Sequence, residues 1–341
     1  MNRVAIVGCG HISTKHVEAL RKIENTAITA FCDVDLKRAQ LLADQHGGKA
    51  YSSIEEMVSA ENFDLVSVLT SSGLHAAHVV ELSNAGCDLL VEKPMALSKS
   101  DAQIMLRAAR KAGVKLYEVK QNRYNPAILA LRRAYERGRF GKLILGTVRV
   151  RWCRTQDYYD QAPWRGSREL DGGVLGNQAV HHLDMLMWFM GPVKSIVAKS
   201  ITANVDIESE DTIVCILKFE SGALGVIEAT TAIRPRNVEG SISIVGRNGF
   251  VEVGGVTMDK IVNWQFSDSE EIDQFEEIGL SDEDDSAGSR HATGHLALYR
   301  ELFGDLVTPS GLVSGEEACR VVEVLDAAYE SASTGKEVFF G

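Results

Sequence analysis

The pattern of apolar and polar residues changes near residue 120, and the first part of the chain has the pattern of a parallel sheet. Short apolar runs occur at residues 4–7, 28–32, 65–69, 89–91 and 116–119. Amphipathic stretches lie between them, among others at residues 14–23, 36–46 and 100–112. Buried strands that alternate with helices pair in parallel and carry helices on both faces of the sheet. Residues 1–120 are therefore expected to form a doubly wound α/β domain.

Beyond residue 120 the pattern is dominated by strands. After a helical stretch at 126–137, strand-like segments lie at 145–152, 195–203, 212–219, 225–231, 241–245 and 250–253. Several alternate apolar and polar residues and are separated by Gly-containing turns, which predicts a mostly antiparallel sheet with one covered face. Helical patterns follow near 293–306 and 315–331. We expect residues 121–341 to form an α+β domain with a large sheet, so the fold class is α/β with two domains.

The composition fits two globular domains. The chain has 341 residues, of which 45% are hydrophobic and 24% charged. No apolar run reaches the roughly 18 residues of a membrane span, and the strand-like start at Val4 predicts no signal peptide. The six cysteines are scattered without a Cys-x-x-Cys pair. They are expected to be reduced, which favours the cytoplasm.

The net charge of −11 arises mainly from one segment of the chain. Ten of the 47 acidic residues lie between residues 268 and 285, and the rest of the chain has 37 acidic against 36 basic residues. The acidic stretch is typical of a solvated loop or an exposed sheet edge. The sequence has no basic tract that could follow the phosphate backbone of a nucleic acid, so we expect no nucleic acid partner.

The start of the chain has the pattern of a dinucleotide site. The strand at 4–7 runs into Gly8-Cys9-Gly10-His11-Ile12-Ser13. Gly8 permits a tight turn, Gly10 lets the backbone approach a pyrophosphate, and His11 and Ile12 begin a helix whose free N–H groups attract the phosphates. This predicts a Rossmann dinucleotide-binding domain.

Asp33 indicates which dinucleotide binds. It ends the second strand, 23 residues after Gly10, where an acidic side chain hydrogen-bonds the adenosine ribose. A carboxylate there repels a 2′-phosphate, and no Arg or Lys follows within three residues. NAD is therefore expected rather than NADP. The alternative is that Asp33 merely caps the next helix.

Two segments carry candidate catalytic groups. Glu92-Lys93-Pro94 follows the strand at 89–91, and the carboxyl ends of parallel strands face the ligand crevice. Pro94 restricts Lys93 to an extended conformation and raises the chance of a cis bond, and the lysine is suited to acid, base or hydroxyl-binding roles beside a nicotinamide. The alternative is a surface lysine in a turn.

The second segment follows Asp171-Gly172-Gly173. Asn177, His181 and Asp184 have the spacing i, i+4, i+7 and are expected on one face of a helix. An imidazole beside an amide and a carboxylate suits proton transfer. The neighbouring His182 is expected to be structural.

These motifs, in this order and spacing, resemble the Gfo/Idh/MocA family, named for glucose–fructose oxidoreductase and inositol dehydrogenase. The resemblance covers essentially the whole chain and implies that Lys93 contacts substrate and nicotinamide and that His181 is the acid/base, so both are the expected catalytic residues. Asn177 stands where the family commonly has Asp, which implies hydrogen bonding to substrate without a carboxylate. The expected cofactor-binding residues are Gly8, Gly10, His11, Ile12, Asp33, Thr70, Ser71, His75, Glu92 and Lys93.

A narrower resemblance is to UDP-N-acetyl-glucosaminuronate and UDP-N-acetylglucosamine 3-dehydrogenases of surface-polysaccharide synthesis. It rests on the segments 121–126, 151–166 and 177–178. Their Arg and aromatic residues suit a diphosphate and a uracil or sugar face; Trp152 and Trp164 fit a core or interface role equally well. The expected substrate-binding residues are Lys93, Asn122, Arg123, Tyr124, Arg154, Tyr159, Trp164, Arg165, Asn177 and His181.

The expected function is NAD-dependent oxidation of a secondary sugar hydroxyl, at C3, by a homodimer or homotetramer that associates through its antiparallel sheet. The alternatives are an inositol or free-sugar dehydrogenase, a glycosidase that oxidises C3 transiently, and a non-catalytic NAD-binding sensor. Near the C-terminus, His291, His295 and Tyr299 share a helical face, which fits substrate contact or helix packing. No metal is expected there.

Overall fold

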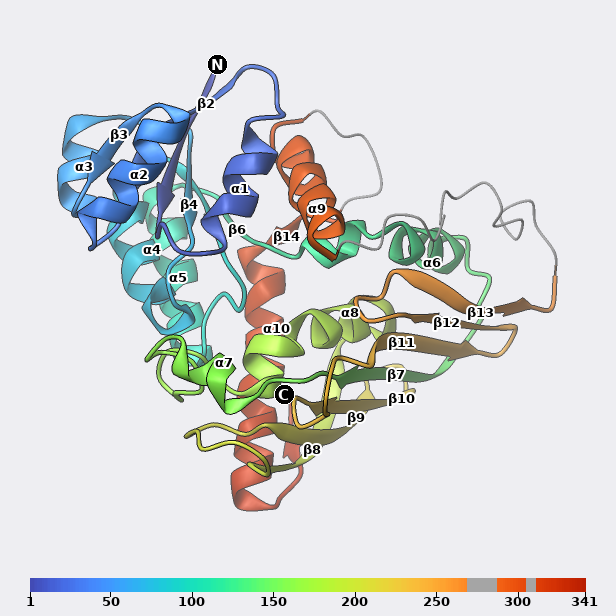
Figure 1. Cartoon of the computed structure of the whole chain (residues 1–341). Helices are drawn as coiled ribbons and strands as arrows, with labels where there is room; N and C mark the ends of the chain where they lie inside the picture. Colours follow the sequence, from blue (N-terminus) through green and yellow to red (C-terminus); the bar gives the residue numbers. More distant parts are fainter. Residues whose placement is uncertain (269–286, 305–310) are drawn as a thin grey trace. The chain divides into compact units, whose positions relative to one another are not determined.

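The structure, a computed structural model, describes residues 1–268, 287–304 and 311–341, and in the helix that begins at 287 it describes side chains from 294 onward. The expected acidic loop at 268–285, apart from Asp268, and the side chain of His291 lie outside the described residues. The chain divides into two compact units, Met1–Gln121 with Ser286–Val322, and Asn122–Asp285 with Glu323–Gly341 (Figure 1).

The first unit contains a seven-stranded sheet in the order β14-β6-β5-β4-β1-β2-β3. All neighbouring strands are parallel except β14, which pairs antiparallel with β6. The bounds are β1 Asn2–Val7, β2 Thr26–Cys32, β3 Lys49–Tyr51, β4 Leu65–Val68, β5 Asp88–Val91, β6 Leu116–Glu118 and β14 Val313–Ser314. The expected Rossmann fold is confirmed.

Helices connect these strands, and polar side chains fix where they begin. The bounds are α1 Ser13–Leu20, α2 Leu36–His46, α3 Ile54–Ala60, α4 His75–Ser83, α5 Lys99–Ala112 and α9 Ala287–Leu302, with short 3₁₀ turns η1 Ser72–Leu74 and η2 Gln121–Tyr124. Asp35, Ser53 and Ser98 cap α2, α3 and α5 by accepting a backbone N–H in the first turn. The helix α5 ends at Gly113 in a left-handed conformation.

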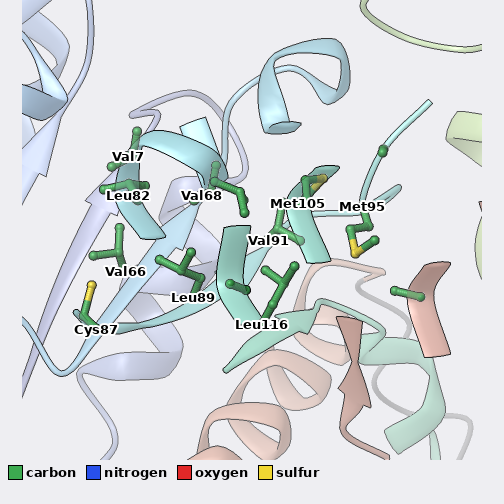
Figure 2. Close-up of a cluster of buried hydrophobic side chains, with 14 of the residues drawn as sticks. Val7, Val66, Val68, Leu82, Cys87, Leu89, Val91, Met95, Met105 and Leu116 are labelled. Atoms are coloured by element: carbon green, nitrogen blue, oxygen red, sulfur yellow. The ribbon is translucent and has the colours of Figure 1, made fainter. Parts of the chain in front are cut away.

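Alternate side chains of the parallel strands build the core on one face of the sheet. Figure 2 shows Val7, Val66, Val68, Leu89 and Val91 of this cluster, together with Leu82 of α4 and Met105 of α5. The remaining strand residues face the other side, where α1 and α2 pack against β2. Burial on both faces explains why these strands are continuous apolar runs in the sequence.

The chain returns to the first unit after residue 286. The strand β14 pairs with β6 at the edge of the sheet, through Val313 opposite Glu118, and α9 packs against α1. The first part of α10 (Gly315–Thr334) also belongs to this unit, up to Val322. The units therefore divide differently from the single boundary expected between residues 120 and 121, because long-range pairing decides the division.

The second unit contains an eight-stranded sheet in the order β13-β12-β11-β7-β10-β9-β8-β15. The bounds are β7 Leu143–Arg151, β8 Val193–Ile201, β9 Thr212–Phe219, β10 Leu224–Thr230, β11 Glu239–Gly246, β12 Gly249–Gly254, β13 Lys260–Phe266 and β15 Val338–Phe339. Only β7 and β10 pair in parallel. The expected large, mostly antiparallel sheet is confirmed, and β13 and β15 extend it at its two edges.

One face of this sheet is covered by helices. They include α6 Pro126–Glu136, a π-helical turn η3 Val174–Gln178, and α8 Val180–Met190, and the short α7 Gln156–Asp160 follows β7 in the chain. The helix α8 contacts β7, β10 and β11. In β9, Ile213, Cys215 and Leu217 are buried while Val214 and Ile216 are exposed. Among the residues that the structure describes, this alternation leaves the opposite face of the sheet uncovered.

Two further expectations concern the whole chain. All six cysteines are free thiols, and all but Cys153 are buried. Among the helices that the structure describes, none combines the length and the apolar character needed to cross a membrane.

His182 on α8 is a fully buried neutral histidine in the second unit. Its side chain is 0% exposed, and its ring meets that of Trp152 edge to face at 5.9 Å. Within the described residues neither ring nitrogen has a hydrogen-bond partner. Burial lowers the pKa of His182 from 6.5 to about 3. The expected structural role for this histidine agrees with these surroundings.

We predict that His182→Phe reduces the acid sensitivity of the second unit. The unfolded chain binds a proton at His182 below pH 6.5, whereas the folded chain binds it only near pH 3. Between these values the residue therefore destabilises the fold as the pH falls, by about 1.4 kcal/mol per pH unit. Urea unfolding at several pH values, followed by tryptophan fluorescence, measures the difference between wild type and variant. All four tryptophans lie in this unit.

The control for this experiment is His46→Phe, which removes a partly exposed histidine of α2. That variant is expected to keep the wild-type pH dependence. Equal slopes for His182→Phe and wild type would show that the buried imidazole does not limit stability in acid.

Candidate functional site

The candidate residues fall into two groups, one in each compact unit, and the first group begins at the turn between β1 and α1. A Cβ at Gly8 would lie 2.7 Å from the backbone of Leu69, and Gly8 has φ +97°. A Cβ at Gly10 would meet nothing within 4 Å. No side chain caps α1 at Ile12. An open approach to Gly10 beside an uncapped helix N-terminus fits the pyrophosphate of a dinucleotide.

Asp33 lies against this turn. Its Oδ2 accepts the backbone N–H of Cys9 at 2.8 Å, and its Oδ1 accepts that of Asp35 at 2.9 Å. The cap of α2 is Asp35, whose side chain accepts the N–H of Lys37. The alternative that Asp33 is the helix cap is therefore wrong. Its carboxylate joins the end of β2 to the Gly-x-Gly turn, and each oxygen retains a further lone pair for a ribose hydroxyl.

Thr70 and Ser71 flank the same turn, because the end of β4 is the backbone that Gly8 approaches. His75 differs from the expectation of direct cofactor contact, because its side chain is fully buried. Its Nδ1 lies 2.9 Å from the carbonyl oxygen of Pro94 and its Nε2 lies 3.0 Å from that of Thr70. His75 therefore holds the Lys93–Pro94 turn against the end of β4.

Lys93 itself is half-buried, in a turn that buried groups hold on both sides. The peptide bond before Pro94 is cis. The backbone N–H of Met95 donates to Glu118 Oε1 at 2.8 Å, and Lys120 Nζ lies 2.9 Å from the same oxygen. Glu92, expected to bind the cofactor, is only 6% exposed and turns its carboxylate into the unit. Sequence reasoning did not identify Glu118 or Lys120, because neither belongs to a recognisable motif.

The second group begins with an irregular backbone. Asn177 lies in the π-helical turn η3, and His181 lies in α8, which begins at Val180. The expectation that Asn177, His181 and Asp184 share one regular helical face is therefore wrong. The Ala179 N–H donates to Val174 O, five residues back, which marks the π turn.

Side chains from distant segments cause this irregularity. The Leu175 N–H donates to Glu210 Oε1 at 3.0 Å, the Gly176 N–H donates to the Tyr329 hydroxyl at 3.1 Å, and that hydroxyl donates to Glu210 at 3.0 Å. A Cβ at Gly173 would overlap the Glu210 carboxylate. Burial, with Asp171 nearby, raises the pKa of Glu210 to about 7. Glu210 and Tyr329 lie 35 and 153 residues from the backbone groups that they bind, so no local pattern indicated them.

The structure brings several expected substrate residues together around Asn177. Its amide donates to Asp171, so a carboxylate does adjoin this position, although it comes from another residue. Gln178 Nε2 donates to Asn177 Oδ1 at 3.0 Å, and Arg154 donates to Gln178 Oε1 at 2.9 Å. The Arg154 guanidinium also lies 5.1 Å from the ring centre of Tyr158. These half-buried polar groups form one connected surface.

Arg123 has a different role from the one expected. Its guanidinium forms two hydrogen bonds with Asp184, at 2.8 and 2.7 Å, and stacks 4.4 Å from the ring centre of Trp188. Arg123 is 3% exposed, and its neighbours Asn122 and Tyr124 are also buried. Its charge is therefore neutralised by Asp184, one turn of α8 beyond His181. The bidentate pair fixes α8 rather than leaving the guanidinium available to a diphosphate.

Two of the expected substrate residues, Tyr159 and Arg165, lie at a separate pocket of about 380 Å³. Tyr159 and Arg165 line it, whereas Trp164 is a half-buried neighbour. Arg165 donates to Tyr158 O and to Gln161 Oε1, at 2.7 and 2.8 Å. The same pocket is lined by acidic side chains, those of Asp160, Asp206 and Glu208.

Comparison with known proteins places the chain among oxidoreductases. Residues 2–120 match the GFO/IDH/MocA oxidoreductase family with its NAD-binding Rossmann fold, and residues 128–252 match the C-terminal domain of that family. The first unit is thus an NAD-binding Rossmann domain, and the expected cofactor is confirmed.

Two similar solved structures are dehydrogenases. The WlbA dehydrogenase from Bordetella pertussis, in complex with NADH and UDP-GlcNAcA, is 36% identical with a TM-score of 0.90, over 100% of this chain and 98% of that one. The WlbA dehydrogenase from Chromobacterium violaceum, with the same two ligands, is 37% identical with a TM-score of 0.90, over 100% and 96%. Among curated relatives, D-apiose dehydrogenase from Paraburkholderia graminis is 31% identical over 67% of this chain, which spans 60% of that relative.

We predict that the two glycines of the turn respond differently to alanine. Gly8→Ala should lower the free energy of unfolding by roughly 1–3 kcal/mol, because its Cβ has no room and φ is positive. Gly10→Ala should fold normally but weaken NAD⁺ binding about tenfold or more, a loss of roughly 1.4 kcal/mol, because the methyl group occupies the open approach. Thermal unfolding and calorimetric titration with NAD⁺ measure both effects. Wild-type affinity in Gly10→Ala would place the pyrophosphate elsewhere.

Proposed function

Because the chain belongs to the Gfo/Idh/MocA family of NAD-binding oxidoreductases, we propose that it oxidises the C3 hydroxyl of UDP-GlcNAcA. It is an NAD-dependent oxidoreductase of the sugar-dehydrogenase type, and the sugar and the carbon position are the proposed part. The observation that supports them is full-length similarity, at 36% and 37% identity, to two dehydrogenases whose structures hold NADH and UDP-GlcNAcA.

In this proposal the first unit binds NAD and the second binds the sugar nucleotide. The Arg154, Tyr158 and Gln178 surface suits such a substrate, because a guanidinium recognises carboxylate or phosphate oxygens and a tyrosine ring packs on a sugar or base. Asn177 presents an amide already held by Asp171. Its fixed orientation suits the recognition of a sugar hydroxyl.

Lys93 and His181 are the proposed catalytic residues. Bound NAD⁺ supplies the acceptor for the hydride that leaves the carbinol carbon. His181 accepts the hydroxyl proton, and the Lys93 ammonium donates to the oxygen while negative charge develops on it. The hydroxyl becomes a ketone, and the proton passes from His181 to solvent. Asp184 and Arg123 hold α8, and therefore the His181 backbone, in place.

A dehydrogenase of free sugars is the second candidate. The similarity to D-apiose dehydrogenase favours it, because that relative is 31% identical over two thirds of this chain. The two candidates make opposite predictions about the nucleotide. A free-sugar enzyme has no use for the Arg154 guanidinium near a diphosphate or uronate, whereas a sugar-nucleotide enzyme depends on it.

Substrate choice is tested by initial-rate measurements with NAD⁺ in excess. Absorbance of NADH and chromatography of the sugar product are followed with UDP-GlcNAcA, UDP-N-acetylglucosamine, D-apiose and myo-inositol. We expect UDP-GlcNAcA to give the highest kcat/KM. Arg154→Gln should raise KM for it about tenfold or more, as loss of a charged hydrogen bond does. Faster oxidation of a free sugar would favour the second candidate.

We predict that Lys93→Met lowers kcat by about 10²–10⁴-fold while NAD⁺ affinity changes little, because methionine keeps the chain length and removes the charge. Lys99→Met, at an exposed lysine six residues further on, is the matched control and should keep wild-type turnover. NADH formation and calorimetric titration measure the two quantities. Turnover retained in Lys93→Met would refute the catalytic role of Lys93.

The second unit is also the proposed site of oligomerisation. On the uncovered face of its sheet, Val214, Ile216 and Leu224 are 46%, 57% and 49% exposed. A charged strip adjoins these apolar residues, where Arg151 pairs with Glu228 at 2.6 Å and with Glu239 at 3.0 Å. An apolar centre beside a charged rim is typical of a surface that associates with a second copy of the same chain.

We predict that Ile216→Lys dissociates the assembly. A lysine at the centre of the apolar face would place an unpaired charge in a dry interface. Light scattering coupled to size exclusion should give a dimer or tetramer for the wild type and a smaller species for the variant. Leu41→Lys, at an exposed leucine of α2, is the control and should keep the wild-type mass. A monomeric wild type would exclude this interface.

A further inference from the structure

A buried carboxylate lies immediately beside the proposed catalytic lysine. Glu92 directly follows β5 and is 6% exposed. Burial alone would raise the pKa of Glu92, but the hydrogen bond from His16 and the nearby ring of His295, whose Nε2 lies 3.8 Å from Glu92 Oε1, outweigh it and hold that pKa well below its ordinary value. Glu92 is therefore ionised at neutral pH inside the first unit. Its two oxygens act only as acceptors.

The ionised carboxylate fixes the direction of every hydrogen bond that leads to it. His16 Nε2 lies 3.0 Å from Glu92 Oε1, so this nitrogen carries the proton. Burial lowers the pKa of His16, which leaves the ring neutral and makes Nδ1 an acceptor. The Tyr299 hydroxyl, 2.6 Å from Nδ1, must therefore donate to it.

The chain of hydrogen bonds extends one step further back, to Ser67 on β4. Burial raises the pKa of Tyr299, so its hydroxyl keeps its proton. Because that proton is donated to His16, the Tyr299 oxygen accepts from Ser67 Oγ at 2.8 Å. A single set of donor and acceptor roles thus satisfies the hydrogen bonds that join Ser67, Tyr299, His16 and Glu92. All four belong to the first unit.

The other end of this chain is the backbone of Lys93. Glu92 Oε2 accepts the Lys93 N–H at 3.0 Å. The residues that follow are held as well, Pro94 through His75 and Met95 through Glu118. Glu92 thus connects the buried hydrogen-bond chain to Lys93, whose side chain is the proposed catalytic group.

The same groups also have the composition of a metal site. His16, Glu92 and His295 each offer one ligand atom, and these atoms lie within 4.8 Å of one another. A metal ion on His16 Nε2 would have to replace the proton that Glu92 accepts, and it would leave the carboxylate without its shortest hydrogen bond. The hydrogen-bond chain accounts for the buried His16–Glu92 pair without an ion.

We propose that Tyr299 and His16 are positioning residues, which orient Glu92 and through it the backbone of Lys93. This inference rests on the proposed catalytic role of Lys93. Tyr299, on α9, lies 206 residues beyond Lys93 in the sequence, so this contribution of the C-terminal part of the chain has no local signal. The charged or titratable groups around Glu92 are His16 on α1, His75 on α4, His295 and Tyr299 on α9, and Lys93 in the turn.

The test removes the tyrosine hydroxyl and keeps its ring. In Tyr299→Phe the ring can still pack against His16 and Phe303, but His16 Nδ1 loses its donor. His16 Nε2 still donates to Glu92, but without the Tyr299 donor its ring is held less firmly and its hydrogen bond to Glu92 is weaker, because hydrogen bonds in a chain polarise one another. We expect kcat to fall about tenfold, with KM and NAD⁺ affinity changed less than about threefold. The acid limb of the kcat profile should move to higher pH, because Glu92 becomes easier to protonate.

Ser67→Ala removes the outermost donor and should lower kcat in the same direction by a smaller factor, which provides a second variant if Tyr299→Phe is poorly folded. Tyr51→Phe is the matched control, because it removes a hydrogen-bonded hydroxyl elsewhere in the same unit and should leave the pH profile unchanged. NMR of ¹⁵N-histidine-labelled protein adds a readout independent of activity. His16 should show the Nε2–H tautomer in the wild type, and its Nδ1 resonance should shift in Tyr299→Phe, where that nitrogen loses its hydrogen-bond donor.

The outcomes separate this inference from the proposed function. If Lys93→Met is inactive while Tyr299→Phe and Ser67→Ala keep wild-type kcat and pH dependence, the positioning role is refuted and the proposed function stands. If Lys93→Met keeps turnover, the proposed function fails, and the His16 tautomer still decides whether the hydrogen-bond chain exists. A stoichiometric metal that remains after purification, and whose removal by EDTA lowers activity, would overturn the positioning role.

Discussion

An ionised carboxylate in a dry interior has to be surrounded by hydrogen-bond donors, and the first unit is organised around this requirement at Glu92. His16 comes from the helix after the Gly-x-Gly turn, and Tyr299, which orients it, comes from a helix near the C-terminus. A buried charge that loses one partner is strongly destabilising, so these elements must hold their relative positions closely. The turn that carries Lys93 takes its shape from this buried network rather than from the preferences of its own residues.

In the second unit, buried polar side chains satisfy backbone N–H groups in the same way. Its π-helical turn cannot form the regular bonds of an α-helix, and the N–H groups of Leu175 and Gly176 are served by Glu210 and Tyr329 instead. The pair of Arg123 and Asp184 fixes the following helix by two charged hydrogen bonds. In both units, then, an irregular segment contains or directly precedes the candidate catalytic residue, and buried polar side chains from far along the chain hold that segment. Irregular backbone of this kind places a side chain where a regular helix or strand would not.

The sequence predicted those features whose causes are local. Apolar runs specified the parallel strands, a glycine that tolerates positive φ marked the turn at Gly8, and Asp33 followed from its place at the end of β2. The π turn was mistaken for a regular helix, because the side chains that reshape it lie at positions 210 and 329. The expectation that Arg123 binds the substrate was wrong, because its burial and its ion pair with Asp184 arise only in the folded structure. The packing of α9 in the first unit could not be predicted either. A sequence shows which face of a helix is apolar but not the surface against which that face packs.

The return of the chain to the first unit has a consequence for how the protein is made. The cofactor domain consists of residues 1–121 and of residues 286–322, so it is discontinuous along the chain. A ribosome that adds about 5–20 residues per second reaches the second stretch roughly 8–33 s after finishing the first. During that interval the nascent Rossmann sheet lacks β14 at its edge, and the carboxylate of Glu92 lacks a histidine oriented by Tyr299. The cofactor domain is therefore begun first and completed late, after most of the second unit has been synthesised.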